Sequence, residues 1–165
     1  MLRKIKKPQI IALFFAVVVS SSLFGCGNSE DSDSNTNEPR TSVTGESLVI
    51  PISEVSATAK FYPVTVDGTD LEVIAVQAPD GSIRTAFNTC QVCYSSGNGY
   101  YKQEGDELVC QNCGNHFTMD QVAVSHGGCN PVPILDDSKS VTADTITIPY
   151  DYLLQSKDLF ASWKK

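Results

Sequence analysis

The sequence has no apolar run long enough to cross a lipid bilayer. Its longest run covers residues 10–19, whereas a membrane-spanning helix needs about 20 apolar residues. The run follows four cations within residues 3–7, with no acidic residue near them, and small residues come after it. This pattern predicts that residues 1–25 are an export signal peptide. The alternative, a retained membrane helix, would have to include three consecutive serines at residues 20–22.

The end of this segment, Leu23-Phe24-Gly25-Cys26, resembles a bacterial lipobox. In such a motif the cysteine is lipidated and becomes the first residue of the mature protein, and its two acyl chains suffice for stable anchoring. We therefore expect a lipid anchor at Cys26 and a location on the extracytoplasmic face of a bacterial cell membrane. The alternative is an ordinary signal peptide followed by an incidental cysteine.

Large apolar side chains and positive charge are both scarce after the predicted signal. Residues 27–45 contain only one large apolar residue, Val43, and such a segment cannot bury enough surface to fold. We predict a lipidated cysteine and disordered tether over residues 26–46 and one folded domain over residues 47–165. The 12 cationic residues less the four in the signal leave 8 against 19 acidic residues, a net charge of −11. This excess argues against nucleic acid as a partner, and it suits a basic protein partner or the capture of cations.

The domain has neither an internal repeat nor the alternating strand–helix pattern of a parallel sheet. Apolar residues alternate at Leu48, Ile50 and Ile52, which is typical of a half-buried strand. Apolar residues at helical spacing between Tyr150 and Trp163 predict a short final helix. The fold class is therefore mostly β, a small antiparallel domain with a short C-terminal helix. Hairpins are predicted around the turns Asp67-Gly68-Thr69-Asp70, Pro79-Asp80-Gly81 and Glu104-Gly105-Asp106.

Five cysteines lie within the predicted domain, and four of them form two C-x2-C pairs. Cys90 and Cys93 are separated by sixteen residues from Cys110 and Cys113, a spacing typical of metal sites. Four thiolates suit zinc or iron. Gly114 follows the second pair, as expected where backbone amides turn toward ligand sulfurs. Two disulfides or a purely structural zinc site are alternatives, whereas a dithiol redox catalyst would need a thioredoxin-like context that the sequence lacks.

The fifth cysteine belongs to a loop rich in glycine and proline. The loop consists of Gly127, Gly128, Cys129 and Asn130, followed by Pro131-Val132-Pro133. Paired glycines permit positive φ and close backbone approach. We therefore expect the loop to cover one side of the centre and to offer amide donors to its sulfurs, which would tune a reduction potential. Cys129 is a candidate fifth ligand, a substitute ligand or a small buried thiol.

Three segments together, residues 84–93, 110–117 and 127–133, resemble the membrane iron–sulfur-containing, FtrD-like family. The resemblance covers residues 47–135 and implies an iron–sulfur cluster, or mononuclear iron, on the two C-x2-C pairs. Some members of the family carry this domain on a multi-span membrane protein and are associated with iron uptake; here the expected lipid anchor takes the place of those spans. More distantly, residues 110–117 are similar to a Rieske box with cysteine in place of histidine. This similarity implies metal-binding loops of a Rieske-like or zinc-ribbon-like kind.

The sequence favours an electron-transfer protein that works with a membrane-protein redox or transport partner. No catalytic acid–base pair or activated nucleophile is visible, so an enzymatic activity is not predicted. His116 and His126 are the only histidines, and we expect them beside the centre or at the surface rather than as ligands. Two other functions stay open. One is a zinc-stabilised accessory module of a membrane complex; the other is metal capture or delivery, with Cys129 and the histidines as an exchangeable site.

Overall fold

The computed structural model describes residues 41–124 and 127–165. The predicted signal peptide, the lipidation at Cys26 and most of the predicted tether lie outside these residues, as does His126. All described residues belong to one compact unit. Within the described ranges, no helix combines the length and the apolar character that crossing a membrane requires.

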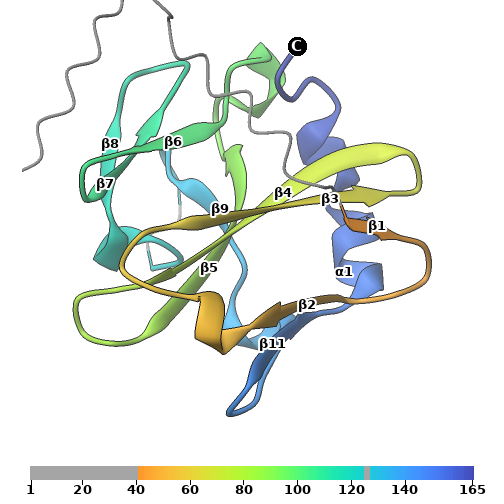
Figure 1. Ribbon diagram of the computed structural model, residues 1–165. Helices are drawn as coiled ribbons and strands as arrows, with labels where there is room; N and C mark the ends of the chain where they lie inside the picture. The colour runs from red at the N-terminus through yellow and green to blue at the C-terminus, as the bar shows by residue number, and fades with distance from the viewer. Residues whose placement is uncertain (1–40, 125–126) are drawn as a thin grey trace, which may run out of the picture. The chain divides into compact units, whose positions relative to one another are not determined.

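The largest sheet has five strands in the order β1-β3-β4-β5-β9 (Figure 1). Neighbouring strands are antiparallel except β1 and β3, which are parallel. The hairpin between β3 and β4 closes with Asp67 and Gly68, whose φ angles of 46° and 75° are those of a two-residue turn that matches the twist of the strands. The strands are β1 (Thr41–Val43), β3 (Lys60–Val66), β4 (Thr69–Gln77), β5 (Ile83–Cys90) and β9 (Pro131–Pro133).

Strand β1 corrects the predicted boundary of the tether. Thr41, Ser42 and Val43 pair with residues 64–66 of β3, and Val43 is buried in the hydrophobic core. The prediction of a tether up to residue 46 is therefore wrong for these three residues. Strand β1 could not be recognised from the sequence, because one apolar residue among polar ones does not form a periodic pattern.

Two smaller antiparallel sheets and one short helix complete the described fold. The strand order is β10-β11-β2 in one sheet and β6-β7-β8 in the other. The first comprises β10 (Ser140–Val141), β11 (Thr145–Ile148) and β2 (Leu48–Pro51). The second comprises β6 (Tyr101–Glu104), β7 (Glu107–Cys110) and β8 (His116–Thr118). The predicted mostly β fold with a short C-terminal helix is confirmed.

The helix α1 (Tyr150–Gln155) is shorter than the predicted segment, and the chain continues as a 3₁₀ turn, Lys157–Phe160. Ser156 lies at the junction, where its hydroxyl donates to the Tyr152 carbonyl at 2.9 Å. A serine that bonds the preceding turn competes with regular helix geometry. Four more 3₁₀ turns connect the strands: Ile52–Glu54, Tyr94–Ser96, Met119–Gln121 and Asp136–Ser138.

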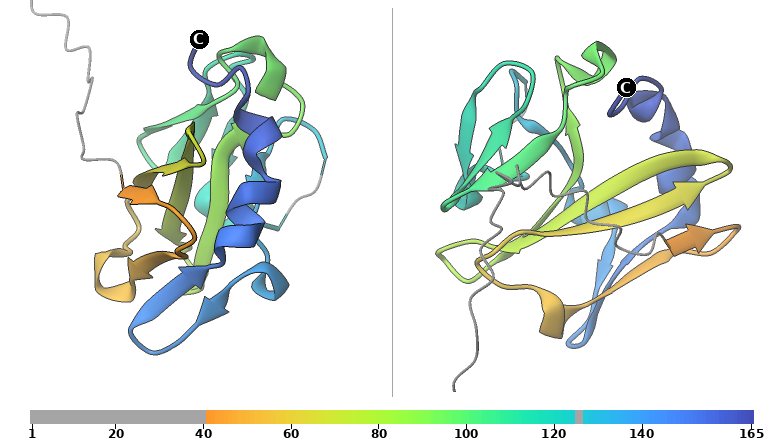
Figure 2. Two further views of the ribbon diagram at one scale, coloured as in Figure 1. Left: turned by 90° about the vertical axis from the view of Figure 1, so that its right-hand side faces the viewer. Right: turned by 45° about the horizontal axis from the view of Figure 1, so that its top comes forward.

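Two separate hydrophobic cores lie on opposite faces of the large sheet. Strand β4 is buried from residue 71 to 76 because its side chains alternate between the cores. Leu71 and Val73 enter the first, which we call the apolar core, and Ile74 enters the second, the cysteine core. The apolar core includes α1 and the C-terminal turns, whereas the cysteine core includes β6 and β7. Figure 2 shows these two groups of elements apart, with the large sheet between them.

Candidate metal centre

The first C-x2-C pair lies at the end of β5, where the strand leaves the large sheet. The pairing of β5 with β9 shifts register between Phe87 and Cys90. A tight turn follows, in which the N–H of Cys93 donates to Cys90 Sγ at 3.2 Å. Gly99 crosses so close to this turn that an added Cβ would lie 2.3 Å from the Cys93 carbonyl oxygen. Only glycine fits there, because real Cβ atoms do not approach so closely.

The second pair has the same local structure at the end of β7. Burial acts to raise the pKa of Cys110 and that of Cys113, while the backbone N–H groups of Cys113 and Asn112 act to lower the pKa of Cys110 and the N–H of Asn115 acts to lower that of Cys113. Gly114, with φ 70°, donates its own N–H to the Cys110 carbonyl at 2.8 Å. Gly114 thus bends the chain, while its neighbours supply the amide donors to sulfur.

The loop that carries Cys129 is fixed to the first turn by Gln91. The Gln91 N–H donates to the Asn130 carbonyl at 3.1 Å, and the Gln91 side-chain amide donates to the Pro131 carbonyl at 3.3 Å. At the other end of the loop, the Gly127 N–H donates to Gln91 Oε1 at 2.9 Å. Gly127 and Gly128 both have positive φ. Three hydrogen bonds of Gln91 therefore hold the Cys129 loop beside the first pair.

The five thiols converge into two overlapping groups. The sulfurs of Cys90, Cys93 and Cys129 lie within 4.8 Å of one another, and so do those of Cys93, Cys110 and Cys113. Cys93 belongs to both groups. Cys90 and Cys110 are buried, Cys93 and Cys129 are half-buried, and Cys113 is exposed. All five described cysteines are free thiols.

Burial and hydrogen bonds shift the pKa values of these thiols in different directions. Burial raises the pKa of Cys93 and that of Cys110 to about 12 each, against the effect of the Asn112 side chain at Cys93 and of amide donors at Cys110. At Cys90 burial also acts to raise the pKa, but the N–H groups of Cys93 and Val92 and neighbouring side chains outweigh it and lower the pKa. Thiolates are the metal-binding form, so a bound cation would displace protons from this site.

A network of buried polar groups lies next to the cysteines. Asn88 Oδ1 accepts the Tyr101 N–H at 2.7 Å, and Asn88 Nδ2 donates to Glu72 Oε1 at 2.6 Å. Lys164 Nζ donates to the same Glu72 oxygen at 3.1 Å. The Tyr101 hydroxyl donates to the Cys129 carbonyl, and burial raises the pKa of Tyr101, which keeps its proton in place. The network therefore links the surface near Lys164 to the loop of the fifth thiol.

Sequence reasoning missed this network, although one feature could have indicated it. Asn88 lies in the buried part of a strand, two residues before Cys90 of the first cysteine pair. Asparagine is depleted in strands, and a buried amide needs partners. Two residues that were predicted to lie beside the centre, His116 and Asn130, have different surroundings from each other. His116 Nδ1 lies 2.9 Å from Glu107 Oε2 on the exposed side of β8, and Asn130 Nδ2 donates to the Gly127 carbonyl at 2.6 Å.

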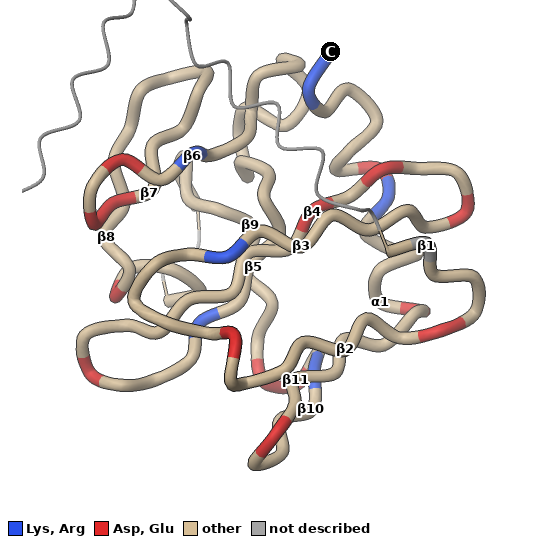
Figure 3. Tube along the Cα trace, in the orientation of Figure 1, with Lys and Arg blue, Asp and Glu red and all other residues tan. Residues whose placement is uncertain are grey.

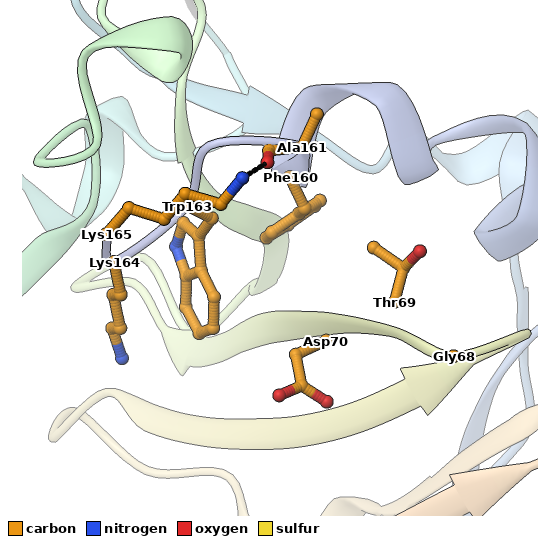
Figure 4. Close-up of a pocket in the computed structure, with 8 residues that line it drawn as sticks. All are labelled: Gly68, Thr69, Asp70, Phe160, Ala161, Trp163, Lys164 and Lys165. Carbon is orange, nitrogen blue, oxygen red and sulfur yellow. Dashed lines mark hydrogen bonds between the residues drawn. The ribbon is translucent and has the colours of Figure 1, made fainter.

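A separate pocket of about 420 Å³ lies near the C-terminal residues. Figure 4 shows Phe160 and Trp163 on one side of it and Thr69 and Asp70, at the start of β4, on the other. No cysteine lines it. Its lining residue Trp163 donates its indole N–H to the Asn88 carbonyl of β5 at 2.8 Å, but the pocket does not form part of the thiol site.

Comparison with known proteins adds one finding. A family model described as membrane iron-sulfur containing protein FtrD-like matches residues 52–160. No curated protein and no solved structure matches the chain, so the similarity to Rieske domains is not shown. The matched range contains both cysteine pairs and the loop of Cys129.

Proposed function

Because this chain belongs to the FtrD-like family of membrane iron–sulfur-containing proteins, we propose that it is a lipid-anchored, extracytoplasmic electron-transfer protein. Cys90, Cys93, Cys110 and Cys113 are the proposed ligands of its iron–sulfur or mononuclear iron centre. The observation that supports this proposal most directly is the convergence of two C-x2-C turns from separate strands, in which the sulfur of Cys93 from the first turn lies within 4.8 Å of those of Cys110 and Cys113 from the second. The proposal includes a link to iron uptake through a membrane-protein partner.

The donor set fits an iron centre. Thiolates are soft ligands that suit iron, iron–sulfur clusters and zinc. When bound, such a centre would take up one electron from a reduced partner and pass it to an oxidised one. Amide donors to the sulfurs at both turns stabilise negative charge on the thiolates, and burial of Cys90 and Cys110 excludes water. Both effects tune a reduction potential.

The exposed side of the centre suits a protein partner. Cys113 is exposed, and Val92 and Tyr94 next to the first pair expose 59% and 39% of their surface. Figure 3 shows acidic residues in the turn between β6 and β7, which precedes the second pair. Exposed apolar residues are typical of the contact region of transient interfaces. The acidic turn lies at the opposite end of the β6–β7 hairpin from Cys110, and its charge favours a basic partner.

Metal analysis of the purified protein tests the proposal. After anaerobic expression we expect stoichiometric iron and a visible absorption that bleaches on reduction. The Cys110→Ser variant should lose most of this absorption, whereas His116→Ala, a control beside the second pair, should keep it. A colourless protein with one zinc would contradict electron transfer. Two disulfides found by mass spectrometry, with neither metal present, would contradict the metal site itself.

The proposed anchor has its own test. Radiolabelled lipid should attach to the full chain and should fail to attach to a Cys26→Ala variant, which should also leave the membrane fraction. Labelling that persists in the variant would contradict lipidation at this cysteine. Neither result depends on the metal.

A structural zinc site is the second candidate, since zinc accepts the same four thiolates. The protein would then be an accessory module of a membrane complex. Metal capture or delivery is a third candidate, and the exposed Cys113 favours it. The metal content distinguishes zinc from iron, and transfer of the metal to a competing chelator within minutes would support delivery.

A further inference from the structure

The fifth thiol lies where a ligand would lie. Cys93 Sγ and Cys129 Sγ are 3.9 Å apart. In a tetrahedral site with metal–sulfur bonds of about 2.3 Å, two ligand sulfurs are separated by roughly 3.8 Å. The distance is therefore the one expected of two ligands on the same ion.

Cys113 and Cys129 differ in their exposure to solvent and in how firmly they are held. Each sulfur lies within 4.8 Å of the Cys93 sulfur, in a different group, and each thiol affects the pKa of the other. Cys113 is exposed at the surface, whereas Cys129 is half-buried and its loop is held by Gln91 and by the Tyr101 hydroxyl. A tetrahedral centre accepts only four of the five sulfurs.

We propose that Cys113 and Cys129 are interchangeable ligands for one coordination position, with Cys90, Cys93 and Cys110 as the constant three. This inference rests on the proposed thiolate centre but not on which metal it holds. In the exchange, the incoming thiol loses one proton and the outgoing thiolate gains one, so neither oxidation state nor net charge changes. The centre can thus open its exposed side to a partner or to an arriving ion while four thiolates stay bound.

Cobalt(II) is a suitable probe because the intensity of its sulfur-to-metal absorption grows with the number of bound thiolates. The full chain is purified in detergent, stripped of metal and titrated with cobalt(II) without oxygen. We expect one cobalt per chain with four thiolates in the wild type. Cys113→Ser and Cys129→Ser should each keep this intensity, because the other cysteine takes the position.

The double variant, Cys113→Ser with Cys129→Ser, should keep about three quarters of the intensity. It should also lose more than about 100-fold in cobalt affinity, since removal of an outer partner alone costs about 10–100-fold. Cys90→Ser is the control, and as a constant ligand it should lose a thiolate by itself. Fluorescence of Trp163, the single tryptophan, reports whether each variant is folded.

The Gln91→Ala variant makes the test more specific, because the Gln91 side chain holds only the loop of Cys129. In the Cys113→Ser background it should weaken cobalt binding about tenfold, and in the Cys129→Ser background it should have no effect. A thiolate lost from either single variant would overturn the proposal, as would two cobalt ions per wild-type chain. If the purified protein contains zinc while the single and double variants behave as expected, electron transfer is contradicted and this inference is supported.

Discussion

The two faces of the large sheet carry cores of different composition. The apolar core contains fifteen buried residues, all aliphatic or aromatic, with Phe87, Phe160 and Trp163 in edge contact at 5.7 and 5.5 Å. The cysteine core contains ten, of which two are the cysteines Cys90 and Cys110. We therefore expect the first face to contribute most of the folding stability and the second to depend more on what its thiols bind. Stability and metal chemistry are divided between the faces of one sheet.

Removal of a large side chain from the apolar core should have the largest effect. Phe87→Ala should lower the free energy of unfolding by about 3–5 kcal/mol, because a buried ring is lost and a cavity remains. Denaturant unfolding followed by Trp163 fluorescence measures this change. The matched control is Phe117→Ala on β8, where the ring is half-buried at the edge of the cysteine core, and we expect a loss of about 1–2 kcal/mol. Equal losses would show that the two cores contribute equally.

A change at Gly99 should have the opposite pattern, with loss of metal and a preserved apolar core. In Gly99→Ala the new methyl would overlap the Cys93 carbonyl and displace the first cysteine turn, so metal affinity should fall about 10–100-fold. The fluorescence of Trp163 in the folded protein should not change.

Gly105→Ala is the control for this variant. Gly105 lies at the tip of the β6–β7 turn, with nothing within 4 Å of an added Cβ. It has φ 63°, so alanine should cost some stability without loss of metal. If both variants lost metal equally, steric conflict at Gly99 would not be the cause.

The smallest expected effect concerns pH at the edge of the apolar core. The Lys157 ammonium bonds to the Asp67 carboxylate at 2.6 Å and holds the pKa of Asp67 below its usual value of 3.8. A carboxyl with a lowered pKa stabilises the fold above pH 3.8, and this stabilisation disappears as the pH falls through the lower, folded value. Asp67→Asn should therefore lower the melting temperature by about 1–2 °C at pH 7, as expected of an exposed pair.

At the lowest pH at which the protein still folds, Asp67→Asn and the wild type should melt together. Asp106→Asn, at the turn beside the cysteine core, is the matched control and should change neither temperature. A difference that grows as the pH falls would contradict the assigned role of Lys157.

The sequence predicted those parts of the fold that local chemistry determines. Asp67-Gly68 and Gly105 indicated hairpins because few other residues adopt the required φ, and the spacing of two C-x2-C pairs indicated a metal site. Strand β1 was missed because its parallel pairing with β3 leaves no local pattern. The network of Asn88 and Tyr101 was missed because its bonds join residues far apart in the chain. The position of Cys129 likewise depends on Gln91, 38 residues earlier, and no spacing rule covers such a contact.

The strand that follows Cys129 has a consequence for the behaviour of the protein among other copies of itself. Strand β9 is the last strand on its side of the large sheet, and two of its three residues are Pro131 and Pro133. Proline has no N–H to donate, so an approaching strand cannot form a complete ladder along this edge. The two prolines that follow the Cys129 loop thus also hinder aggregation through this edge of the sheet.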